Sequence, residues 1–566
     1  MGGKRTLPGM APEGTVDFGA VAAGAPFDFT VCRGVYEIAA DTTITRNIRF
    51  EQGGMLRPIG GAKVTITGRV WADITQHIFD IADGEVIGSF GNVARSPCWW
   101  GAVGDYAGDA DAATNNYDAL GACARASHYR VGVRSRVVVP TGNFFCEGPV
   151  RPAINNPAYG ILPGEVPHLS EAGVIQMYIG DVWEGESLGS SYITVGNGTA
   201  GVGYVFAMAG ADSSGPPTVV KDLFIVAELG GAYGLTGAIG GHANGAFIEK
   251  CWINGFGRGL LMGSTDQFVT RLVIEYCHEA IRIIRGHNNL SDCTLYLCGN
   301  GIIVDPYDEQ GETVISDIRI NNRNGGLPGG YGIVVTGAYA ACKVVNVDVE
   351  GAPGGGEWDY AFSVYYSLST AWTNCRAKIV GDHPAWTLAF VGQAQLVNCS
   401  ARLVSGASTS AALDIHSNST AVSVSQFMAS GRFRDGIRVN TAGRGVQITG
   451  ASITGASRNG LRVLRCSSLK VANSDFLNND EAGIYDQIAA GEDGLHLYTG
   501  ITSERAGSGV QAWGLVTKID NVNGRFAISG ACGILGNGSG AISHTGAYNP
   551  GNNNSKIKIG AEVLVA

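Results

Sequence analysis

The sequence predicts an all-β protein folded as a right-handed parallel β-helix, a solenoid in which successive coils stack along one axis. Of its 566 residues, 85 are glycine, 16% are charged and 45% are hydrophobic, a composition typical of a folded chain rather than a disordered one. Short apolar segments recur between 247 and 487 with a period of roughly 21 to 28 residues, which is the range of solenoid repeats. Such segments can bury their apolar side chains only by stacking on the next coil, with parallel strands about 4.8 Å apart.

Each repeat has two halves. In one half, two short alternating strands flank a turn, and in the other a glycine bend leads into a single short strand. The first kind occupies 247–255, 290–297, 372–380, 396–404, 446–455 and 469–477. The second kind occupies 258–263, 300–305, 331–336, 435–440, 459–464 and 482–487.

Alignment of the first halves predicts two ladders at the turn. Asparagine tolerates the left-handed conformation, and its amide can bond to the next coil, so one turn position forms an asparagine ladder of Asn346, Asn374, Asn398 and Asn473. The following position carries thiols, which we expect to pack inward rather than to act in catalysis. These thiols belong to Cys251, Cys293, Cys375 and Cys399.

The two ends of the chain differ from the repeats. Residues 1–97 are predicted to form a small β region, because 34–75 alternates with a period of two between glycine-rich turns. The β-helix is placed at 98–495, beginning with a capping helix at about 113–128. That helix would cover the end of the coil stack with one face, made of Tyr117, Leu120, Cys123, Ala124 and Ser127. Residues 496–566 are interpreted as a C-terminal β cap or trimerisation region.

Charge, hydropathy and cysteine spacing argue against several classes of partner. The formal net charge of -10, without any run of Lys or Arg, disfavours nucleic acid. No secretory signal and no run of about 18 apolar residues is found, so we expect synthesis in a cytoplasm and no membrane insertion. The 13 cysteines form no CxxC pair, and the sequence predicts no metal and no cofactor.

One stretch resembles a known family. The motif WWGAVGD at 99–105, followed by Asp109, Ala112 and Ala113 and then by VVVPTGNF at 137–144, is similar to the N-terminal motif of the pectate-lyase-like β-helix family found in phage tailspikes. Where that family often has a paired-aspartate step, this chain has Asp109, Ala110 and Asp111.

The resemblance implies a homotrimer in a phage virion, which would attach to other tail or baseplate proteins through its N-terminal region. It also implies a bacterial surface polysaccharide as the partner. Neither the calcium and arginine set of pectate lyases nor the triple aspartate of polygalacturonases can be placed on this sequence, so the family lends a fold and a substrate class but no site.

Alternation within the glycine-started strands directs their polar residues outward, onto a face along which a sugar chain could lie. Carboxylates act there as acid, base or nucleophile, while planar donors and aromatic rings hold the sugar. The predicted substrate-binding residues on this face are Arg282, Tyr365, Arg438, Asn440 and Arg462.

Two sets of catalytic candidates follow. Glu279 and Asp305 fall on adjacent coils, within the roughly 5 to 9.5 Å used by glycosidases, although ordinary surface ion pairs with Arg282 are the alternative. Asp414 and His416, joined by Arg438 and Asn440 of the next coil, would suit lyase chemistry. The alternative for this second set is a simple pair between Asp414 and Arg438 on neighbouring coils.

Three functions remain open at this point. The first is a trimeric tailspike or tail fibre that binds a host polysaccharide and cleaves it by hydrolysis or elimination. The second is a non-catalytic receptor-binding or structural tail protein. The third is a bacterial polysaccharide lyase or epimerase that acts without a virion.

Overall fold

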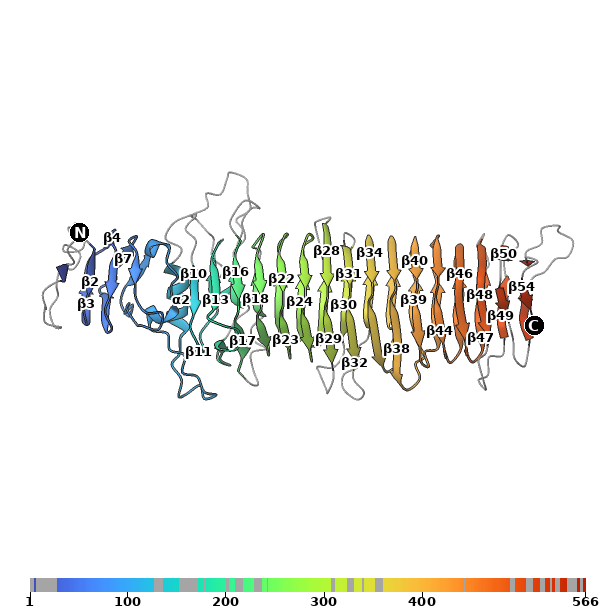
Figure 1. Cartoon of the computed structure of the whole chain (residues 1–566), viewed down its shortest axis with the longest axis horizontal. Helices are drawn as coiled ribbons and strands as arrows, with labels where there is room; N and C mark the ends of the chain where they lie inside the picture. Colours follow the sequence, from blue (N-terminus) through green and yellow to red (C-terminus); the bar gives the residue numbers. More distant parts are fainter. Residues whose placement is uncertain are drawn as a thin grey trace. The chain divides into compact units, whose positions relative to one another are not determined.

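The computed structural model describes most of the chain, which is almost entirely β-strand (Figure 1). The chain divides into two compact units, Met1–Cys277 and His278–Ala566, called unit 1 and unit 2 below. The described residues are 5–6, 28–126, 136–151, 172–177, 180–199, 203–208, 217–228, 237–241, 243–306, 311–322, 330–337, 340–351, 360–441, 443–488, 494–504, 513–519, 525–529, 532–534, 540–546, 557–559 and 563–565.

The N-terminal part of unit 1 consists of three small parallel sheets, β1-β2-β5-β8, β3-β6 and β4-β7-β9. The predicted β region is therefore itself built by parallel stacking. A cluster of buried rings closes its end, with the ring centroids of Phe79 and Trp100 5.2 Å apart. The strands are β1 (Arg5–Thr6), β2 (Phe29–Val31), β3 (Gly34–Ile38), β4 (Thr42–Ile44), β5 (Ile48–Phe50), β6 (Gly54–Pro58), β7 (Lys63–Ile66), β8 (Val70–Trp71) and β9 (Glu85–Gly88), followed by the short 3-10 helices η1 (Phe90–Asn92) and η2 (Pro97–Trp100).

The predicted capping helix exists but is shorter than expected: α2 spans Tyr117–Arg125. It cannot begin at 113, because the side-chain amide of Asn116 bonds to the backbone of Val103, Thr114 and Phe145 and fixes a loop there. Leu120, Cys123 and Ala124 are buried as predicted, whereas Ser127 lies outside the described residues. The helix packs against η2 and β12, at the start of the coils.

The coils of unit 1 contribute one strand each to a first parallel sheet and two strands each to a second. The first sheet contains β12 (Gly173–Met177), β15 (Tyr204–Met208), β18 (Gly237–Gly241) and β21 (Arg258–Met262). The second contains β10 (Arg136–Val139), β11 (Gly142–Cys146), β13 (Val182–Gly185), β14 (Ser191–Val195), β16 (Val219–Lys221), β17 (Phe224–Ala227), β19 (Phe247–Glu249), β20 (Trp252–Asn254), β22 (Phe268–Thr270) and β23 (Val273–Glu275).

Unit 2 repeats this plan. Its first sheet, called the face sheet below, has one strand per coil: β24 (Glu279–Ile283), β27 (Asn300–Val304), β30 (Tyr331–Thr336), β33 (Tyr360–Tyr365), β36 (Trp386–Ala389), β39 (Ala411–His416), β42 (Asp435–Asn440), β45 (Asn459–Arg465), β47 (Ala482–Ile488), β49 (Trp513–Ile519) and β52 (Gly540–Gly546).

The companion sheet of unit 2 contains β25 (Asn289–Ser291), β26 (Thr294–Tyr296), β28 (Gly311–Ser316), β29 (Arg319–Asn322), β31 (Ala340–Val345), β32 (Asp348–Gly351), β34 (Ser369–Thr373), β35 (Arg376–Val380), β37 (Gln393–Val397), β38 (Ser400–Ser405), β40 (Val422–Ser425), β41 (Met428–Ser430), β43 (Val446–Thr449), β44 (Ser452–Thr454), β46 (Ser468–Leu477), β48 (Leu495–Glu504), β50 (Arg525–Ser529), β51 (Cys532–Ile534), β53 (Ile557–Ile559) and β54 (Val563–Val565). The parallel β-solenoid predicted from the repeats is thus confirmed, and the strands described beyond 495 continue its sheets.

The asparagine ladder is confirmed in part. Asn374 donates to Asn346 at 3.0 Å and Asn398 donates to Asn374 at 2.8 Å, and all three have φ values near 55°. Asn473 shares the left-handed conformation, with φ 48°, but its neighbours at this position are Gly450 and Gly500, which have no amide to offer. The ladder therefore ends before it.

The aligned cysteines are buried, as predicted, and each sulfur contacts a backbone carbonyl of its own unit. Burial raises the pKa of the Cys251 thiol to about 12, so the reactive thiolate is suppressed. All 13 cysteines lie within the described residues, and all of them are free thiols.

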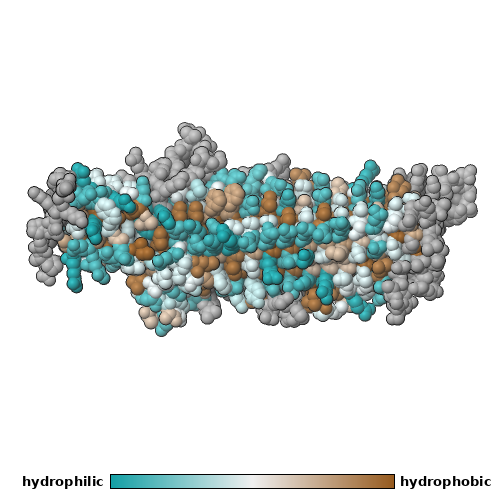
Figure 2. Space-filling view, in the orientation of Figure 1, coloured by the Kyte–Doolittle hydropathy of each residue, from teal (hydrophilic) through white to brown (hydrophobic). Residues whose placement is uncertain are grey.

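The two units divide at 277/278, and the domain limits interpreted from the motifs, at 97/98 and 495/496, stay a prediction. Among the described residues no helix combines the length and the apolar content needed to cross a bilayer. Exposed apolar side chains occur as small patches between hydrophilic ones on the side drawn in Figure 2.

Candidate functional site

The polar residues singled out on the glycine-started strands fall into two adjacent outward rows of the face sheet. In the first row, Asp414, Arg438 and Arg462 pair in register on successive coils. In the second row, Tyr365, Ala389, His416 and Asn440 do the same. Because apolar residues such as Ile415 and Val439 point inward between the two rows, alternation along each strand is sufficient to direct these side chains outward.

The first catalytic pair is separated by an arginine. Arg282 Nη1 lies 3.4 Å from Glu279 Oε1, and Arg282 Nη2 lies 3.2 Å from Asp305 Oδ2. Glu279 begins β24 and Asp305 follows β27, as predicted, but the guanidinium contacts both carboxylates. This arrangement corresponds to the surface ion pairs that we considered as the alternative.

The second set centres on a tight ion pair. Arg438 Nε donates to Asp414 Oδ1 at 2.8 Å, and Arg438 Nη2 contacts the other carboxylate oxygen. The Asp414 side chain is only 6% exposed, whereas that of Arg438 is 29% exposed. The hydrogen bond to Asp414 raises the pKa of the Arg438 guanidinium above its ordinary value, so the arginine is charged at every working pH. The structure therefore contains the predicted alternative, an ion pair between Asp414 and Arg438 on neighbouring coils.

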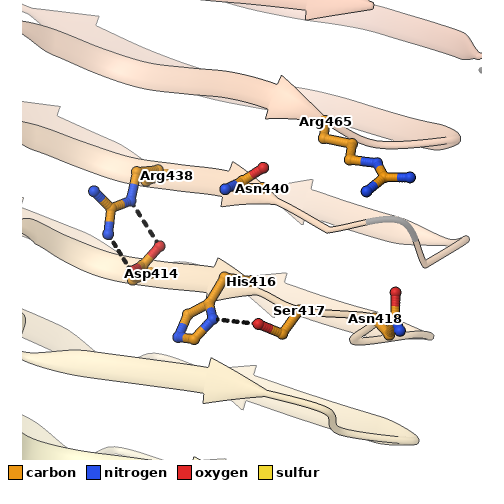
Figure 3. A pocket seen from close by; sticks show the side chains of 7 residues that line it. All are labelled: Asp414, His416, Ser417, Asn418, Arg438, Asn440 and Arg465. Atoms are coloured by element: carbon orange, nitrogen blue, oxygen red, sulfur yellow. Dashed lines mark hydrogen bonds and ion pairs between the residues drawn. The ribbon is translucent and has the colours of Figure 1, made fainter. Parts of the chain in front are cut away.

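Beside this pair lies a polar hollow of about 450 Å³ (Figure 3). The next turn supplies Ser417 and Asn418 to its wall, which sequence reasoning missed, although they directly follow His416. The hollow is lined by Asp414, His416, Ser417, Asn418, Arg438, Asn440 and Arg465, which come from three consecutive coils.

The imidazole of His416 is the ring most available for chemistry in this hollow. Its Nδ1 lies 2.8 Å from Ser417 Oγ, and its Nε2 has no partner among the described residues. When Nδ1–H donates to the serine, Nε2 carries the lone pair and can accept a proton. Asn440 adds an exposed amide in register with His416.

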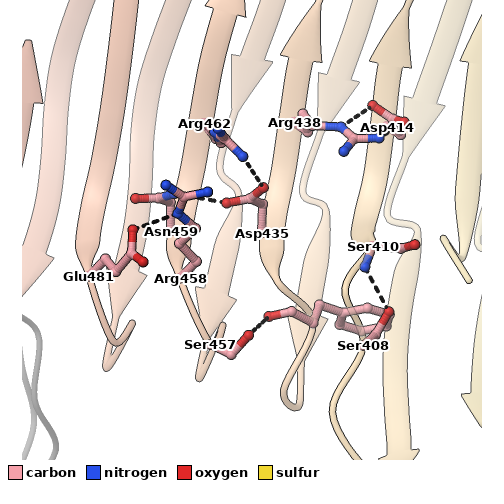
Figure 4. A network of polar contacts seen from close by, with 11 residues as sticks. Ser408, Ser410, Asp414, Asp435, Arg438, Ser457, Arg458, Asn459, Arg462 and Glu481 are labelled. Carbon is pink, nitrogen blue, oxygen red and sulfur yellow. Dashed lines mark hydrogen bonds and ion pairs between the residues drawn. The ribbon is translucent and has the colours of Figure 1, made fainter. Parts of the chain in front are cut away.

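Arg462 is placed differently from its predicted role. Its Nη1 lies 3.5 Å from Oδ2 of Asp435, and its side chain is 16% exposed. Asn459 donates to the other oxygen of the buried Asp435 at 2.8 Å, so the carboxylate is held between two coils (Figure 4). Arg462 thus supports the face sheet next to the hollow and is not among the residues that line it.

Tyr365, the one aromatic residue among the predicted substrate-binding residues, lies at the surface, unlike two nearby tryptophans. Trp372 and Trp386 are core residues, whereas Tyr365 is 44% exposed and Tyr366 is 47% exposed. The ring centroids of these two tyrosines are 4.4 Å apart and their planes are nearly perpendicular. Hydrogen bonding to Tyr366 raises the pKa of the Tyr365 phenol.

A second cluster of titratable groups lies inside the solenoid and was missed. His496 Nδ1 lies 2.8 Å from Asp486 Oδ2, its Nε2 lies 2.9 Å from the carbonyl oxygen of Cys466, and the Tyr498 hydroxyl donates to Asp486 Oδ2 at 2.7 Å. All three side chains are buried. Within the described part of the chain, no three His, Cys, Asp or Glu residues are grouped so as to hold a metal ion.

Comparison with known proteins gives no family. No protein-family description matches the sequence, and no curated protein resembles it. Among solved structures, the chain is similar to tailspike protein 3 of bacteriophage CBA120, with 13% identity and a TM-score of 0.38, over 83% of this chain and 62% of the tailspike. This chain therefore corresponds to less than two thirds of that tailspike.

Two further similar structures are enzymes. The catalytic unit of a GH87 alpha-1,3-glucanase from Streptomyces thermodiastaticus is 12% identical with a TM-score of 0.36, over 79% of this chain and 69% of the glucanase. The A-module of the mannuronan C-5 epimerase AlgE4 from Azotobacter vinelandii is 12% identical with a TM-score of 0.29, over 84% of this chain and the whole module. At these identities and scores the similarities define no function.

Proposed function

We propose that the protein binds an extended polysaccharide along the outer side of the face sheet of unit 2, and that the hollow beside Asp414 and Arg438 is one of its sugar subsites. The observation that carries this proposal is the lining of the hollow. It combines two guanidinium groups, two amides, a carboxylate, a hydroxyl and an imidazole on three consecutive coils, which is a set of donors and acceptors suited to sugar hydroxyls.

The repeating architecture supports an extended ligand. Coils follow one another about every 4.8 Å, so groups in one outward row recur at a constant interval along a straight line. A polymer with a regular repeat can contact such a row over several coils. The two outward rows, of which the second includes Tyr365, His416 and Asn440, therefore form the proposed path of the polysaccharide.

Elimination is the chemistry that the hollow favours if the chain is cleaved. Elimination needs a base for the proton next to a sugar carboxylate, and His416 Nε2 is accessible for this role. Arg438 and Arg465 would face the negative charge that develops during the reaction. Hydrolysis by Glu279 and Asp305 is less well supported, because Arg282 lies in contact with both carboxylates, where the scissile oxygen would have to lie.

For the biological setting, the motif that includes WWGAVGD supports a phage tailspike or tail fibre. In this proposal the N-terminal region attaches the protein to other tail or baseplate proteins, three copies form a trimer, and unit 2 contacts a bacterial surface polysaccharide. A bacterial lyase or epimerase outside a virion remains the alternative assignment.

The test is a binding and cleavage assay with capsule and lipopolysaccharide preparations from candidate hosts. We expect retention of one of them by the wild type and a loss of binding of at least tenfold in Arg465→Ala. Arg458→Ala is the matched control, because its guanidinium pairs with Glu481 and does not line the hollow.

Products distinguish the chemistries. Unsaturated sugar ends that disappear in His416→Ala would support elimination, whereas new reducing ends without unsaturation would contradict the role of His416. Binding without either product identifies a receptor-binding protein. Equal binding by Arg465→Ala and the wild type would contradict the proposed subsite.

A further inference from the structure

A partly exposed aromatic stack, which ends one coil before Ser417, has an unusual backbone conformation. Tyr366 and Phe390 follow β33 and β36 at equivalent positions of successive coils, since Tyr366 N donates to Ala389 O and Phe390 N donates to Ser417 O. Both have positive φ values, 55° and 53°. Glycine and asparagine adopt this conformation readily, whereas it is strained for bulky side chains.

The rings of these two residues stack along the direction in which the coils repeat. Their centroids are 4.5 Å apart and their planes differ by 9°, so each ring covers the next at about the coil spacing. Tyr365 lies beside this stack, with its ring centroid 4.4 Å from that of Tyr366 and 5.7 Å from that of Phe390, and its plane is nearly perpendicular to both. Phe390 is therefore the last ring of the stack and forms a floor, Tyr366 lies behind it, and Tyr365 flanks both.

Among the described residues, the next position along this stack carries no aromatic side chain. The equivalent residue of the following coil is Ser417, which also has a positive φ of 52° but carries a small side chain. A flat group could therefore continue the stack on the outer side of Phe390, over Ser417. Such a group would lie at the edge of the hollow, because Ser417 lines the hollow together with His416.

We infer that this slot is a sugar subsite in which a pyranose ring lies on Phe390, in the place where a third aromatic ring would continue the stack, with Tyr366 supporting the opposite face of Phe390. The inference rests on the proposed function and makes it more specific. It identifies the ligand as a polysaccharide containing a pyranose that presents several axial C–H bonds on one face, because such a face packs on an aromatic ring.

The slot would also orient the sugar for the polar groups. A ring placed over Ser417 lies next to the imidazole of His416, whose Nδ1 bonds to the same serine. Asn440 follows in register one coil further. Phe390, Ser417 and Asn440 thus lie on three consecutive coils. The left-handed backbone conformation, which favours glycine or asparagine, keeps the side chains of Tyr366 and Phe390 on the outer side of the sheet.

Substitutions in the stack test this inference by separating binding from stability. Phe390→Asn removes the floor while placing a residue that tolerates positive φ. We expect affinity for the polysaccharide retained most tightly by the wild type to fall about tenfold, while the unfolding temperature stays the same or rises. Tyr276→Asn is the matched control: Tyr276 is also exposed, with φ 52°, but it follows β23 of unit 1 and does not line the hollow.

Filling the slot is the complementary test. Ser417→Tyr places a ring where the sugar would lie, and we expect it to lower affinity far more than Ser417→Ala, which removes the same hydroxyl but leaves the slot open. Equal affinities of these two variants would overturn the inference, as would wild-type affinity in Phe390→Asn.

The remaining outcomes are also decisive. A lower unfolding temperature or a changed sedimentation mass of Phe390→Asn would show that the rings serve folding or a subunit contact, and would overturn the inference. If Arg465→Ala loses binding while the aromatic variants keep it, the proposed function stands and the inferred sugar subsite on Phe390 is wrong. If the wild type retains none of the preparations, both are wrong.

Discussion

Unit 2 contains two clusters that combine aspartate and histidine, and their surroundings give them different roles. Asp414 and His416 lie on the outer side of the face sheet, where the histidine keeps one nitrogen for a ligand. Asp486 and His496 lie in the core, where every ring nitrogen and carboxylate contact is made within the protein. The comparison teaches that burial separates the two clusters: the core cluster has its polar groups paired within the protein, whereas the surface cluster is the one that the proposed function assigns to recognition.

The core cluster also satisfies both ring nitrogens of its histidine. His496 Nδ1 lies against the carboxyl group of Asp486, and His496 Nε2 lies against a backbone carbonyl. Tyr498 adds a third hydrogen bond to the buried pair of His496 and Asp486.

The largest effect is expected from breaking this buried pair. His496→Ala leaves Asp486 in the core without the imidazole that contacts both of its carboxyl oxygens, and removing one partner of a buried pair costs about 3–5 kcal/mol of folding free energy. Chemical denaturation of the variant, followed by circular dichroism, measures this loss. A variant as stable as the wild type would show that the cluster of Asp486 and His496 does not stabilise the fold, which would contradict the comparison.

A smaller loss of folding free energy is expected from Arg438→Ala on the face sheet. The variant leaves Asp414, which is 6% exposed, without its charged hydrogen bonds, a cost of about 1.5–3 kcal/mol that solvent at the exposed arginine reduces further. Denaturation and polysaccharide binding are measured on the same preparation. We expect both to weaken, whereas lost stability with intact binding would make the pair purely structural.

Alkaline pH should affect the core cluster through Tyr498. Burial, followed by the charge and the hydrogen bond of Asp486, raises the pKa of Tyr498 well above the ordinary phenol value of about 10. The contribution of Tyr498 is therefore intact below pH 10, and it declines as pH rises further, by up to about 1.4 kcal/mol per pH unit, because only the unfolded chain releases the proton readily. Unfolding curves of Tyr498→Phe and the wild type between pH 9 and 11 measure this, and parallel declines would contradict it.

Asn440→Ala should weaken binding without changing stability. The side chain is exposed, so its removal leaves no buried group unpaired, yet the hollow loses an amide in register with His416. We expect affinity for polysaccharide to fall about tenfold, which corresponds to roughly 1.4 kcal/mol. Isothermal titration against the retained polysaccharide checks the loss, and an unchanged affinity would place the sugar elsewhere.

The smallest effect is expected from Glu279→Gln. Partly exposed ion pairs such as that between Glu279 and Arg282 contribute about 0–1 kcal/mol, and the guanidinium still contacts Asp305. Stability and polysaccharide cleavage should both remain close to those of the wild type. Loss of cleavage with intact binding would restore Glu279 and Asp305 as the catalytic pair.

The repeats predicted the fold because each coil carries the same local information. Alternating apolar residues, glycine bends and left-handed asparagines recur from 247 to 487, so twelve half-repeats there could be placed from the sequence alone. Between 150 and 246, inside the region assigned to the β-helix, the individual repeats were not recognised, since the spacing from Tyr204 to Gly237 exceeds that from Arg258 to Glu279 and hides the period.

For the candidate site, the sequence predicted which side chains belong to the two outward rows, but not which contacts these side chains make. Alternation showed that Asp414, His416, Arg438 and Asn440 point outward on adjacent coils. It could not show that Arg282 lies between Glu279 and Asp305, because side-chain conformations are decided by contacts across coils. Phe390 was missed for a similar reason, since its exposure depends on a turn conformation that aromatic residues seldom adopt.

The central claim is that the hollow beside Asp414 and Arg438 holds a sugar, and a crystal structure of the protein with an oligosaccharide from the retained polysaccharide tests it most directly. We expect a pyranose ring over Ser417, against Phe390 and within hydrogen-bonding distance of His416 and Asn440. An oligosaccharide bound at another surface, with this hollow filled by water, would contradict the account.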